Sequence, residues 1–243
     1  MQRADGRGPH QLRPTRISVD SFGFAEGSAL IEQGETRVLC AVSIDSGVPP
    51  WLRGQNQGWI TGEYALLPRS TTTRTRRERT GASGRTQEIQ RLIGRSLRIA
   101  IDLKLLGEHT ITVDCDVLQA DGGTRTASIT GGYVALALAL HRLQARGAIE
   151  HNPLVQAIAA VSAGYVNGTA LLDLDYNEDS AAELDCNVVQ TGSGEIVEVQ
   201  CTAEGRAVTR SELDQLLDIT SDGIQILLEE QRSVLVRAGV NVL

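Results

Sequence analysis

The feature that most restricts the fold is a long run of small and apolar residues from Thr126 to Arg146, which includes the segment YVALALAL. Gly147 follows this run as a helix-stop residue, so the pattern predicts one helix. A helix with so little polar surface is stable only when other elements bury it. We therefore expect the rest of the chain to pack around this helix.

Strand-like segments precede and follow the predicted helix. In the first half they cover residues 15–20, 27–44, 58–67 and 110–118. The segment 27–44 is expected to be a hairpin that turns at Gln33 and Gly34, so an antiparallel first sheet is predicted. In the second half the strand-like segments cover residues 155–166, 169–176, 186–192 and 195–203.

Two further helices follow from capping signals. Thr86 is the expected N-cap of a helix that places apolar residues at helical spacing. Thr209 and Glu212 form a capping box, and the helical pattern after them runs to Gly239 with a break expected near residues 222–223. These two helices are expected to pack against the strands.

Strands followed by helices occur twice along the chain, which predicts an α+β fold with two mixed or antiparallel sheets packed on helices. We expect a single domain over residues 1–243, with an N-terminal half (1–150) and a C-terminal half (151–243). The segments GSALIEQG (27–34) and GTALLDLD (168–175) suggest an internal duplication.

Composition excludes some classes of function. Aromatic residues are only 3% of the chain, which argues against base stacking as the main recognition device. No apolar stretch reaches the roughly 18 residues that span a bilayer, so we expect no membrane association and a cytoplasmic location. The cysteines Cys40, Cys115, Cys186 and Cys201 are far apart in apolar segments, which predicts reduced thiols in the core.

Charge is distributed very unevenly along the chain. The net charge is -7, yet nine arginines and two glutamates lie between Arg69 and Arg98. The segment from Gly147 to Gly205 has no lysine or arginine. One segment is thus suited to anions and another to cations. The polar stretch 68–86, which contains most of these arginines, is expected to be a mobile surface loop.

The stretch DGGTRTASITGG, residues 121–132, enters the predicted buried helix through glycines and hydroxyl residues. Helix N-termini present unpaired N–H groups that favour an anion. Gly123 lets an anion approach the backbone, Thr124 adds a hydroxyl and Arg125 adds a cation, which together predict a phosphate site. Arg85 precedes another helix start in the same way. The alternative for residues 121–125 is an ordinary helix cap with a solvated arginine, and the alternative at Arg85 is a glycine-containing loop that ends in a cap.

An acidic stretch lies in the second half of the chain. Glu178, Asp179, Glu183 and Asp185 fall within eight residues that contain no cation. Asp179 and Asp185 are candidates to hold Mg²⁺ or Mn²⁺, with water and a substrate phosphate completing the coordination shell. The alternative is an exposed acidic loop.

Phosphate sites, a divalent cation site and an arginine-rich loop are what phosphoryl transfer on an RNA backbone requires. Serine-nucleophile chemistry has less support, because the sequence contains no G-x-S-x-G motif. The histidines His10, His109, His141 and His151 lie in no recognisable catalytic setting.

A resemblance to a known family rests on motifs along nearly the whole chain. They are RADGR, LRP, GWITGEYALLPRST, SGRTQEIQRLIGRSLR, DCDVLQADGGTRTASITGGYVAL, DLDYNEDSAAELDCNVV and VQCTAEG. With these motifs the chain resembles the ribonuclease PH family of phosphate-dependent tRNA 3′-end exonucleases, also described as tRNA nucleotidyltransferases. Gly62 and Gly132 stand where the resemblance leads us to expect alanine.

The resemblance implies phosphorolysis, in which inorganic phosphate releases the 3′-terminal nucleotide of tRNA precursors, and of other structured RNA 3′ ends, as a nucleoside diphosphate. The reverse reaction adds nucleotides. The implied roles are phosphate binding by Arg85, Gly123, Thr124 and Arg125, metal binding by Asp179 and Asp185, and RNA binding by Arg69, Arg74 and Arg77. Arg125, Asp179 and Asp185 are the implied catalytic residues. The implied assembly is a homo-oligomer, a hexameric ring arranged as a trimer of dimers.

Two alternatives compete with this interpretation. One is a ring subunit of exosome type that binds RNA without cutting it, and the other is a nuclease that uses water instead of phosphate. The resemblance leaves open whether Asp185 is a general acid or a metal ligand, and how trimming stops near the mature 3′ end.

Overall fold

The computed structural model describes residues 3–78, 80–204 and 206–240. The helices are α1 (Gly84–Ile99), α2 (Leu103–Leu106), α3 (Thr124–Ala145), α4 (Tyr176–Ala181) and α5 (Arg210–Arg237), with a short 3-10 helix η1 (Pro50–Leu52). The strands are β1 (Thr15–Val19), β2 (Gly27–Gln33), β3 (Thr36–Ser46), β4 (Trp59–Leu66), β5 (His109–Gln119), β6 (Ile158–Val166), β7 (Thr169–Leu172), β8 (Leu184–Thr191) and β9 (Ile196–Ala203). The predicted α+β class is confirmed.

The first sheet has five strands in the order β1-β2-β3-β5-β4. Its first four strands are antiparallel, whereas β4 runs parallel to β5. The first sheet was expected to be antiparallel, and this edge makes it a mixed sheet, which the predicted class of mixed or antiparallel sheets includes. A parallel pair needs a crossover connection, and here the chain from β4 to β5 passes through α1.

The second sheet has four antiparallel strands in the order β7-β6-β8-β9. Its strand number and order differ from those of the first sheet. The internal duplication suggested by the sequence therefore stays a prediction.

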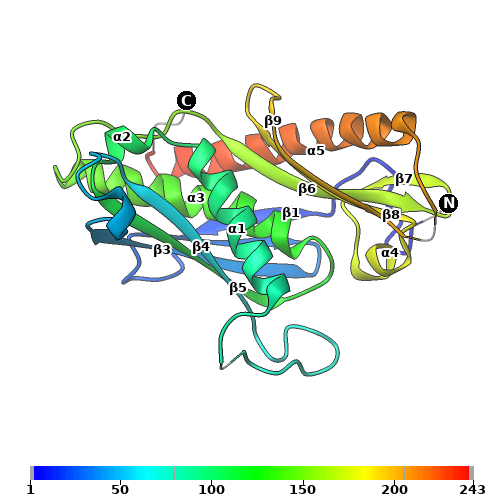
Figure 1. The fold of residues 1–243 in the computed structure, drawn as a ribbon. Coiled ribbons are helices and arrows are strands. Elements are labelled where there is room, and N and C mark those ends of the chain that lie inside the picture. Colours follow the sequence, from blue (N-terminus) through cyan, green and yellow to red (C-terminus); the bar gives the residue numbers. More distant parts are fainter. Residues whose placement is uncertain (1–2, 79, 205, 241–243) are drawn as a thin grey trace.

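The apolar run starting at Thr126 forms α3, the central helix of the molecule. Every residue from Thr126 to Leu140 is buried. The helix contacts β2, β3 and β5 of the first sheet and β6 of the second, and Figure 1 shows it running behind α1 toward both sheets. The largest apolar cluster accordingly contains residues from both halves of the chain, such as Leu136 and Val189.

The outer helices differ from prediction in two details. Ser83, and not Thr86, caps α1, because the Ser83 side chain accepts a hydrogen bond from the Thr86 backbone N–H. The capping box of Thr209 and Glu212 is present at the start of α5. This helix runs without the expected break at residues 222–223 and lies along the second sheet (Figure 1). The helix continues through Gly223, which is buried, because α5 packs against β6 and β7 at this point.

The prediction for the cysteines is correct for one pair and wrong for the other. Cys40 and Cys115 are buried free thiols. Cys186 and Cys201 form a disulfide between β8 and β9, where the strand register places them directly opposite each other. Sequence spacing could not show this pairing, because it depends on the register of two strands.

Neighbouring glycines of α3 have opposite packing environments. A Cβ atom on Gly131 would lie 2.8 Å from Ile31 Cγ2, whereas one on Gly132 would lie 3.4 Å from Val113 Cγ1, an ordinary contact distance. We expect Gly132→Ala to raise the free energy of unfolding by about 0.5–1 kcal/mol, since alanine is the better helix former. Gly131→Ala should lower it by about 1–3 kcal/mol through overpacking. Urea denaturation measures both, and equal effects of the two variants would contradict this account.

Within the described parts of the chain, no helix combines the length and the apolar character needed to cross a membrane.

Candidate active site

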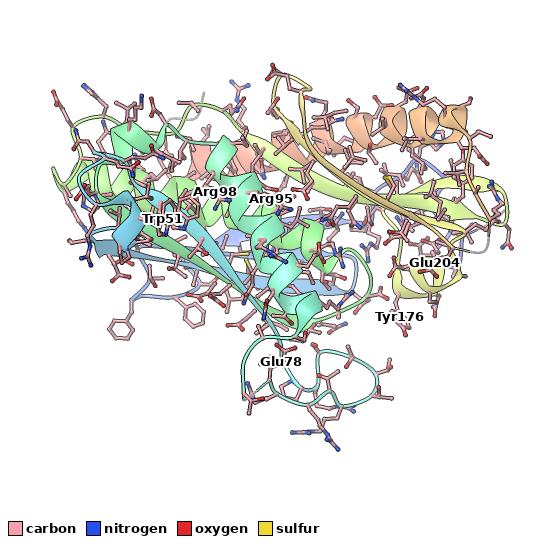
Figure 2. The ribbon with its side chains drawn as sticks, in the orientation of Figure 1. Trp51, Glu78, Arg95, Arg98, Tyr176 and Glu204 are labelled. Carbon is pink, nitrogen blue, oxygen red and sulfur yellow. A yellow bond between two sulfur atoms is a disulfide. The ribbon has the colours of Figure 1, made fainter. Side chains whose placement is uncertain are left out.

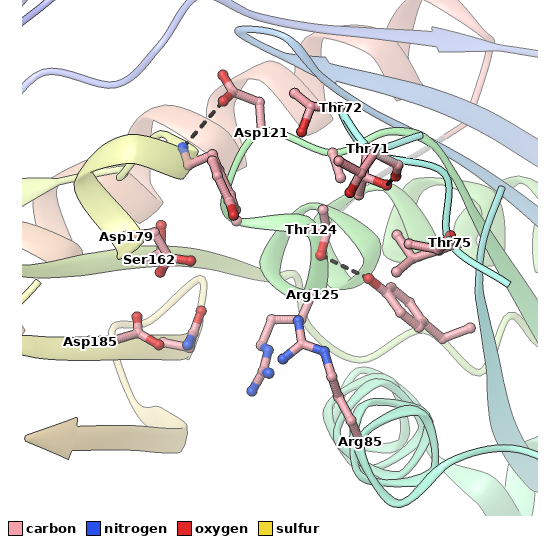
Figure 3. A pocket seen from close by; sticks show the side chains of 18 residues that line it. Thr71, Thr72, Thr75, Arg85, Asp121, Thr124, Arg125, Ser162, Asp179 and Asp185 are labelled. Atoms are coloured by element: carbon pink, nitrogen blue, oxygen red, sulfur yellow. Dashed lines mark hydrogen bonds between the residues drawn. The ribbon is translucent and has the colours of Figure 1, made fainter. Parts of the chain in front are cut away.

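A cavity of about 330 Å³ lies where the start of α3 meets α1, α4 and β8. Figure 3 shows Arg85 and Arg125 close together on one side of it and Asp179 and Asp185 on the other. These four residues come from segments separated by up to a hundred positions, and the fold brings them into one cavity. Gly123 and Thr124 line the same cavity. The binding role of each stays a prediction.

The turn before α3 has the backbone geometry of an anion site. Gly122 and Gly123 have φ angles of +74° and +63°, the left-handed region that glycine adopts without strain. Gly123 is the N-cap of α3, so the free N–H groups of the first helical turn begin at this point. The Thr124 hydroxyl lies 2.8 Å from the Tyr64 hydroxyl, which fixes its orientation.

Gln200 and Glu88 hold the Arg125 side chain in place. Its guanidinium donates a hydrogen bond to Gln200 Oε1 at 3.2 Å and lies 3.5 Å from Glu88 Oε2. Gln200 in turn donates to Glu88 Oε1 at 2.9 Å. The guanidinium therefore has an oriented support, while Arg85 reaches the cavity from the first turn of α1.

Asp179 and Asp185 form the acidic side of the cavity. Asp179 lies on α4, and Asp185 lies on β8. Burial raises the pKa of Asp179, although Arg125 and Arg85 counteract part of that rise. Burial and the neighbouring charge of Asp179 raise the pKa of Asp185 to about 6. Two carboxylates that resist ionisation side by side are typical of a cation site or of proton transfer.

The carboxylates fit a hard cation. Asp185 Oδ1 is buried and has no hydrogen-bond partner among the residues that the structure describes. No group of three or more His, Cys, Asp or Glu side chains within residues 3–78, 80–204 and 206–240 could hold a metal ion. A cation at Asp179 and Asp185 would therefore need other oxygen ligands, which suits Mg²⁺ because it usually retains water and binds substrate phosphates.

The other two acidic residues of this stretch have cationic partners that the sequence did not reveal. Glu178 pairs with Arg3 at 2.5 Å, and Glu183 pairs with Arg206 at 2.8 Å. The expectation of four uncompensated carboxylates is thus wrong for these two. Both arginines are distant in sequence from their partners, so inspection of the acidic segment alone could not find them.

The arginine-rich loop joins β4 to α1 and projects from the body beyond the start of α1 (Figure 1), and threonines of this loop line the cavity. Arg69, Arg74 and Arg77 are exposed on it, while Arg79 lies outside the described residues. Its base is attached to the body, since the Ala120 backbone N–H donates to Ser70 O at 2.8 Å. Its predicted mobility and RNA binding stay predictions. Glu78 of the loop lies beside the start of α1 (Figure 2). Its carboxylate accepts hydrogen bonds there from the Ser83 backbone N–H and the Thr86 hydroxyl.

Sequence reasoning missed several residues that line the cavity. Tyr64, Ser162 and Asn187 contribute polar side chains from three strands, and the loop contributes threonines. Tyr176, the first residue of α4 (Figure 2), is exposed and also lines the cavity. The threonine run at residues 71–73 was a visible signal, whereas nothing local distinguishes Asn187 from other strand residues.

Comparison with protein families covers most of the chain. Residues 11–141 match domain 1 of the 3′ exoribonuclease family, and residues 156–223 match domain 2. The cavity is lined by residues from both matched segments.

Individual relatives agree with this match. The chain is 57% identical to a protein named ribonuclease PH from Moorella thermoacetica, over 97% of this chain and 95% of that protein. It is 52% identical to ribonuclease PH from Syntrophomonas wolfei, over 97% of this chain and 99% of that protein.

Solved structures show the same fold. Rice Rrp46 gives a TM-score of 0.78 at 21% identity, over 96% of this chain and 100% of that one. A chain of the Archaeoglobus fulgidus exosome, solved with RNA bound to the active site, also gives 0.78 at 24% identity, over 94% of this chain and 92% of that one. With two consecutive domain matches and relatives more than 50% identical, the chain belongs to the 3′ exoribonuclease family.

Proposed function

We propose that this protein is a phosphorolytic 3′-to-5′ exoribonuclease that trims the 3′ ends of tRNA precursors with inorganic phosphate. The observation that carries the proposal is the single cavity in which two arginines and a glycine turn face two carboxylates. Family membership and relatives named ribonuclease PH support the same activity.

In the proposed reaction an oxygen of inorganic phosphate attacks the phosphorus of the terminal nucleotide. A new P–O–P linkage forms, and the bond from that phosphorus to the 3′ oxygen of the preceding ribose breaks. The products are a nucleoside diphosphate and an RNA shorter by one nucleotide, whose 3′ oxygen takes up a proton. The reverse reaction extends the RNA.

Arg125, Arg85 and the N–H groups at Gly123 and Thr124 would orient the attacking phosphate. Two anions must meet in this reaction, so concentrated positive charge lowers the cost of their approach. A Mg²⁺ or Mn²⁺ ion at Asp179 and Asp185 would neutralise charge on the scissile phosphate. Asp185 is also the candidate general acid, because its raised pKa of about 6 keeps a fraction of this carboxyl protonated near neutral pH.

The experiment is an assay of the purified protein with Mg²⁺ and a tRNA bearing extra 3′ nucleotides, with and without phosphate. Nucleoside diphosphates that form only with phosphate support the proposal. Monophosphates formed without phosphate would indicate hydrolysis. Tight RNA binding with no nucleotide released would instead indicate a non-catalytic ring subunit of exosome type.

The loop arginines are proposed to bind the phosphate backbone of the tRNA. We expect the triple variant Arg69→Ala, Arg74→Ala, Arg77→Ala to weaken tRNA binding and to reduce the slope of log affinity against log salt by about three, since each lost phosphate contact lowers it by about one. The Michaelis constant for phosphate should stay unchanged.

The control for this variant replaces three exposed arginines outside the loop, namely Arg16, Arg53 and Arg146. It makes the same change in net charge. An equal loss of salt dependence in both triple variants would show that overall charge, and not the loop, binds the RNA.

The proposal includes a hexameric ring made as a trimer of dimers, a cytoplasmic location and one functional domain built from residues 1–243. Shared lining of the cavity by both halves supports the single domain. Likeness to a chain of the archaeal exosome core supports the fold on which such an assembly would be built. Sedimentation equilibrium measures the number of subunits directly.

A further inference from the structure

The N-terminal segment carries arginines that are buried behind the cavity and that the proposed reaction does not use. Arg3, Arg7 and Arg13 have side chains that are 0%, 8% and 3% exposed. None of them lines the cavity. Buried arginines have to be paired, so their partners indicate what the segment holds in place.

Arg13 is bound to Asp173 through three hydrogen bonds. Its backbone N–H and its Nε donate to Asp173 Oδ2 at 2.7 and 3.1 Å, and one terminal nitrogen donates to Oδ1 at 2.6 Å. Asp173 is itself 1% exposed. It stands two residues before Asp175, the N-cap of α4, and α4 carries Asp179.

The other terminal nitrogen of Arg13 reaches the opposite side of the site. It donates to the backbone oxygen of Asp121 and lies 3.8 Å from Asp121 Oδ2. Asp121 Oδ1 accepts a hydrogen bond from the Tyr176 N–H at the start of α4, at 3.2 Å (Figure 3). Arg13, Asp121 and Asp173 therefore form a closed bridge between the turn before α3 and the segment before α4.

The two bridged segments are also in direct contact. A Cβ atom on Gly122 would lie 2.3 Å from Leu174 O, so glycine is needed for this approach. A Cβ atom on Gly123 would lie 3.1 Å from a terminal nitrogen of Arg13. A shift of Arg13 would therefore be transmitted both to the turn and to the start of α4.

We propose that Arg13 is a positioning residue that fixes the separation between the anion-binding turn at Gly123 and the carboxylate of Asp179. This inference rests on the proposed function, because it assumes that phosphate binds the turn and that Asp179 acts on the scissile group. Arg13 sets the position of the attacking phosphate relative to the scissile phosphate without touching either substrate. Misplacement by about 1 Å is enough to cost on the order of 100-fold in rate.

Arg7 provides a matched control. Its guanidinium donates to Asp173 O at 3.1 Å and lies 3.7 Å from Asp173 Oδ2, so it holds the same residue. Among the described residues its other partners are Asp5 and Gln11 on the N-terminal segment and Glu178 on α4, at 3.8 Å, and none lies on the turn before α3. Loss of Arg7 should loosen Asp173 while leaving the bridge to Asp121 in place.

The test compares Arg13→Lys with Arg7→Lys, because lysine keeps the charge and removes the forked geometry. For Arg13→Lys we expect kcat of phosphorolysis to fall about 10- to 100-fold, with the Michaelis constant for phosphate and the dissociation constant for tRNA within about threefold of the parent protein. For Arg7→Lys we expect kcat within about threefold. If kcat falls in both variants in proportion to their loss of thermal stability, the proposal is overturned.

Hydrogen–deuterium exchange without substrate tests the bridge independently of activity. Arg13→Lys should increase exchange at residues 121–124 and at 173–176, whereas Arg7→Lys should increase it only at 173–176. Unchanged exchange at 121–124 in Arg13→Lys would refute the bridge. If the parent protein shows no phosphorolysis, the proposed function fails while this exchange result still decides the bridge.

A second variant covers the case in which Arg13→Lys does not fold. Asp121→Ala removes the side chain that accepts from Tyr176 and leaves the backbone carbonyl that Arg13 binds. We expect exchange at Tyr176 to rise and kcat to fall by at least about fivefold. Parent-like exchange at Tyr176 together with parent-like kcat would show that the link from Asp121 to α4 is not needed, and it would overturn the closed bridge on which the proposal rests.

Discussion

Arg125→Ala is expected to raise the Michaelis constant for phosphate by about 100-fold while changing the affinity for tRNA by less than about threefold. The guanidinium is held by Gln200 and Glu88, and Arg125 lines the same cavity as the turn at Gly123. A 100-fold change corresponds to about 2.7 kcal/mol, which lies within the range of about 1.5–3 kcal/mol for one hydrogen bond to a charged group. Steady-state kinetics at varied phosphate concentration measures it.

Arg146→Ala is the control for this result. Arg146 is exposed and caps the other end of the same helix, so its loss changes the net charge equally without altering the cavity. Its phosphate kinetics should match the parent protein. Equal weakening of phosphate and tRNA binding by Arg125→Ala would contradict a specific role in holding phosphate.

Asp185→Asn is expected to lower kcat by at least about 100-fold and, at the same time, to stabilise the fold at neutral pH. The size of the kinetic loss is that seen when one preorganised electrostatic group is removed from a reaction site. The stability change follows from the pKa of about 6, because burial beside Asp179 makes the ionised carboxylate unfavourable in the folded state.

The direction of the pH effect is set by this raised pKa. A carboxyl with a higher pKa in the folded state than in the unfolded state contributes stability at low pH, and this contribution is lost as pH rises through about 6. Asp185→Asn should therefore raise the free energy of unfolding by about 2 kcal/mol at pH 7.5, with a gain that shrinks toward pH 4. Urea denaturation across this range measures the change.

Asp114→Asn serves as the matched variant for Asp185→Asn. Asp114 is another half-buried strand aspartate whose pKa burial raises, and it does not line the cavity. It should give a smaller gain in stability with parent-like kcat.

The affinity of the parent protein for Mn²⁺ should also fall below pH 6, because Asp185 is then protonated. Mn²⁺ binding that does not depend on pH would exclude Asp185 as a ligand.

The candidate site could be predicted from the sequence to the extent that its parts are local. Gly123, Thr124 and Arg125 are adjacent, and the glycine that begins a helix is visible in the sequence. The capping box of α5 was predictable for the same reason, since its two partners are three residues apart. Arg85, Asp179 and Asp185 were candidates from their residue types and sequence context, and the resemblance to a family implied the role of each.

Non-local contacts account for what the sequence left hidden. Glu178 is neutralised by Arg3 across 175 positions, and Cys186 meets Cys201 only through the register of β8 and β9. Ser83 caps α1 one turn earlier than the pattern at Thr86 indicated, because Glu78 of the loop orders that start.

By itself the sequence determined the buried central helix, most of the strands, the chemical nature of the glycine turn and the separation of basic from acidic segments. These properties depend on residue types within a few positions of one another, and local propensity and periodicity express them directly. Only the tertiary structure decided the parallel pairing of β4 with β5, the cavity that joins Arg125 to Asp185, and the bridge through Arg13. Each of these depends on which distant surfaces bury each other, and that choice is made by packing over the whole chain.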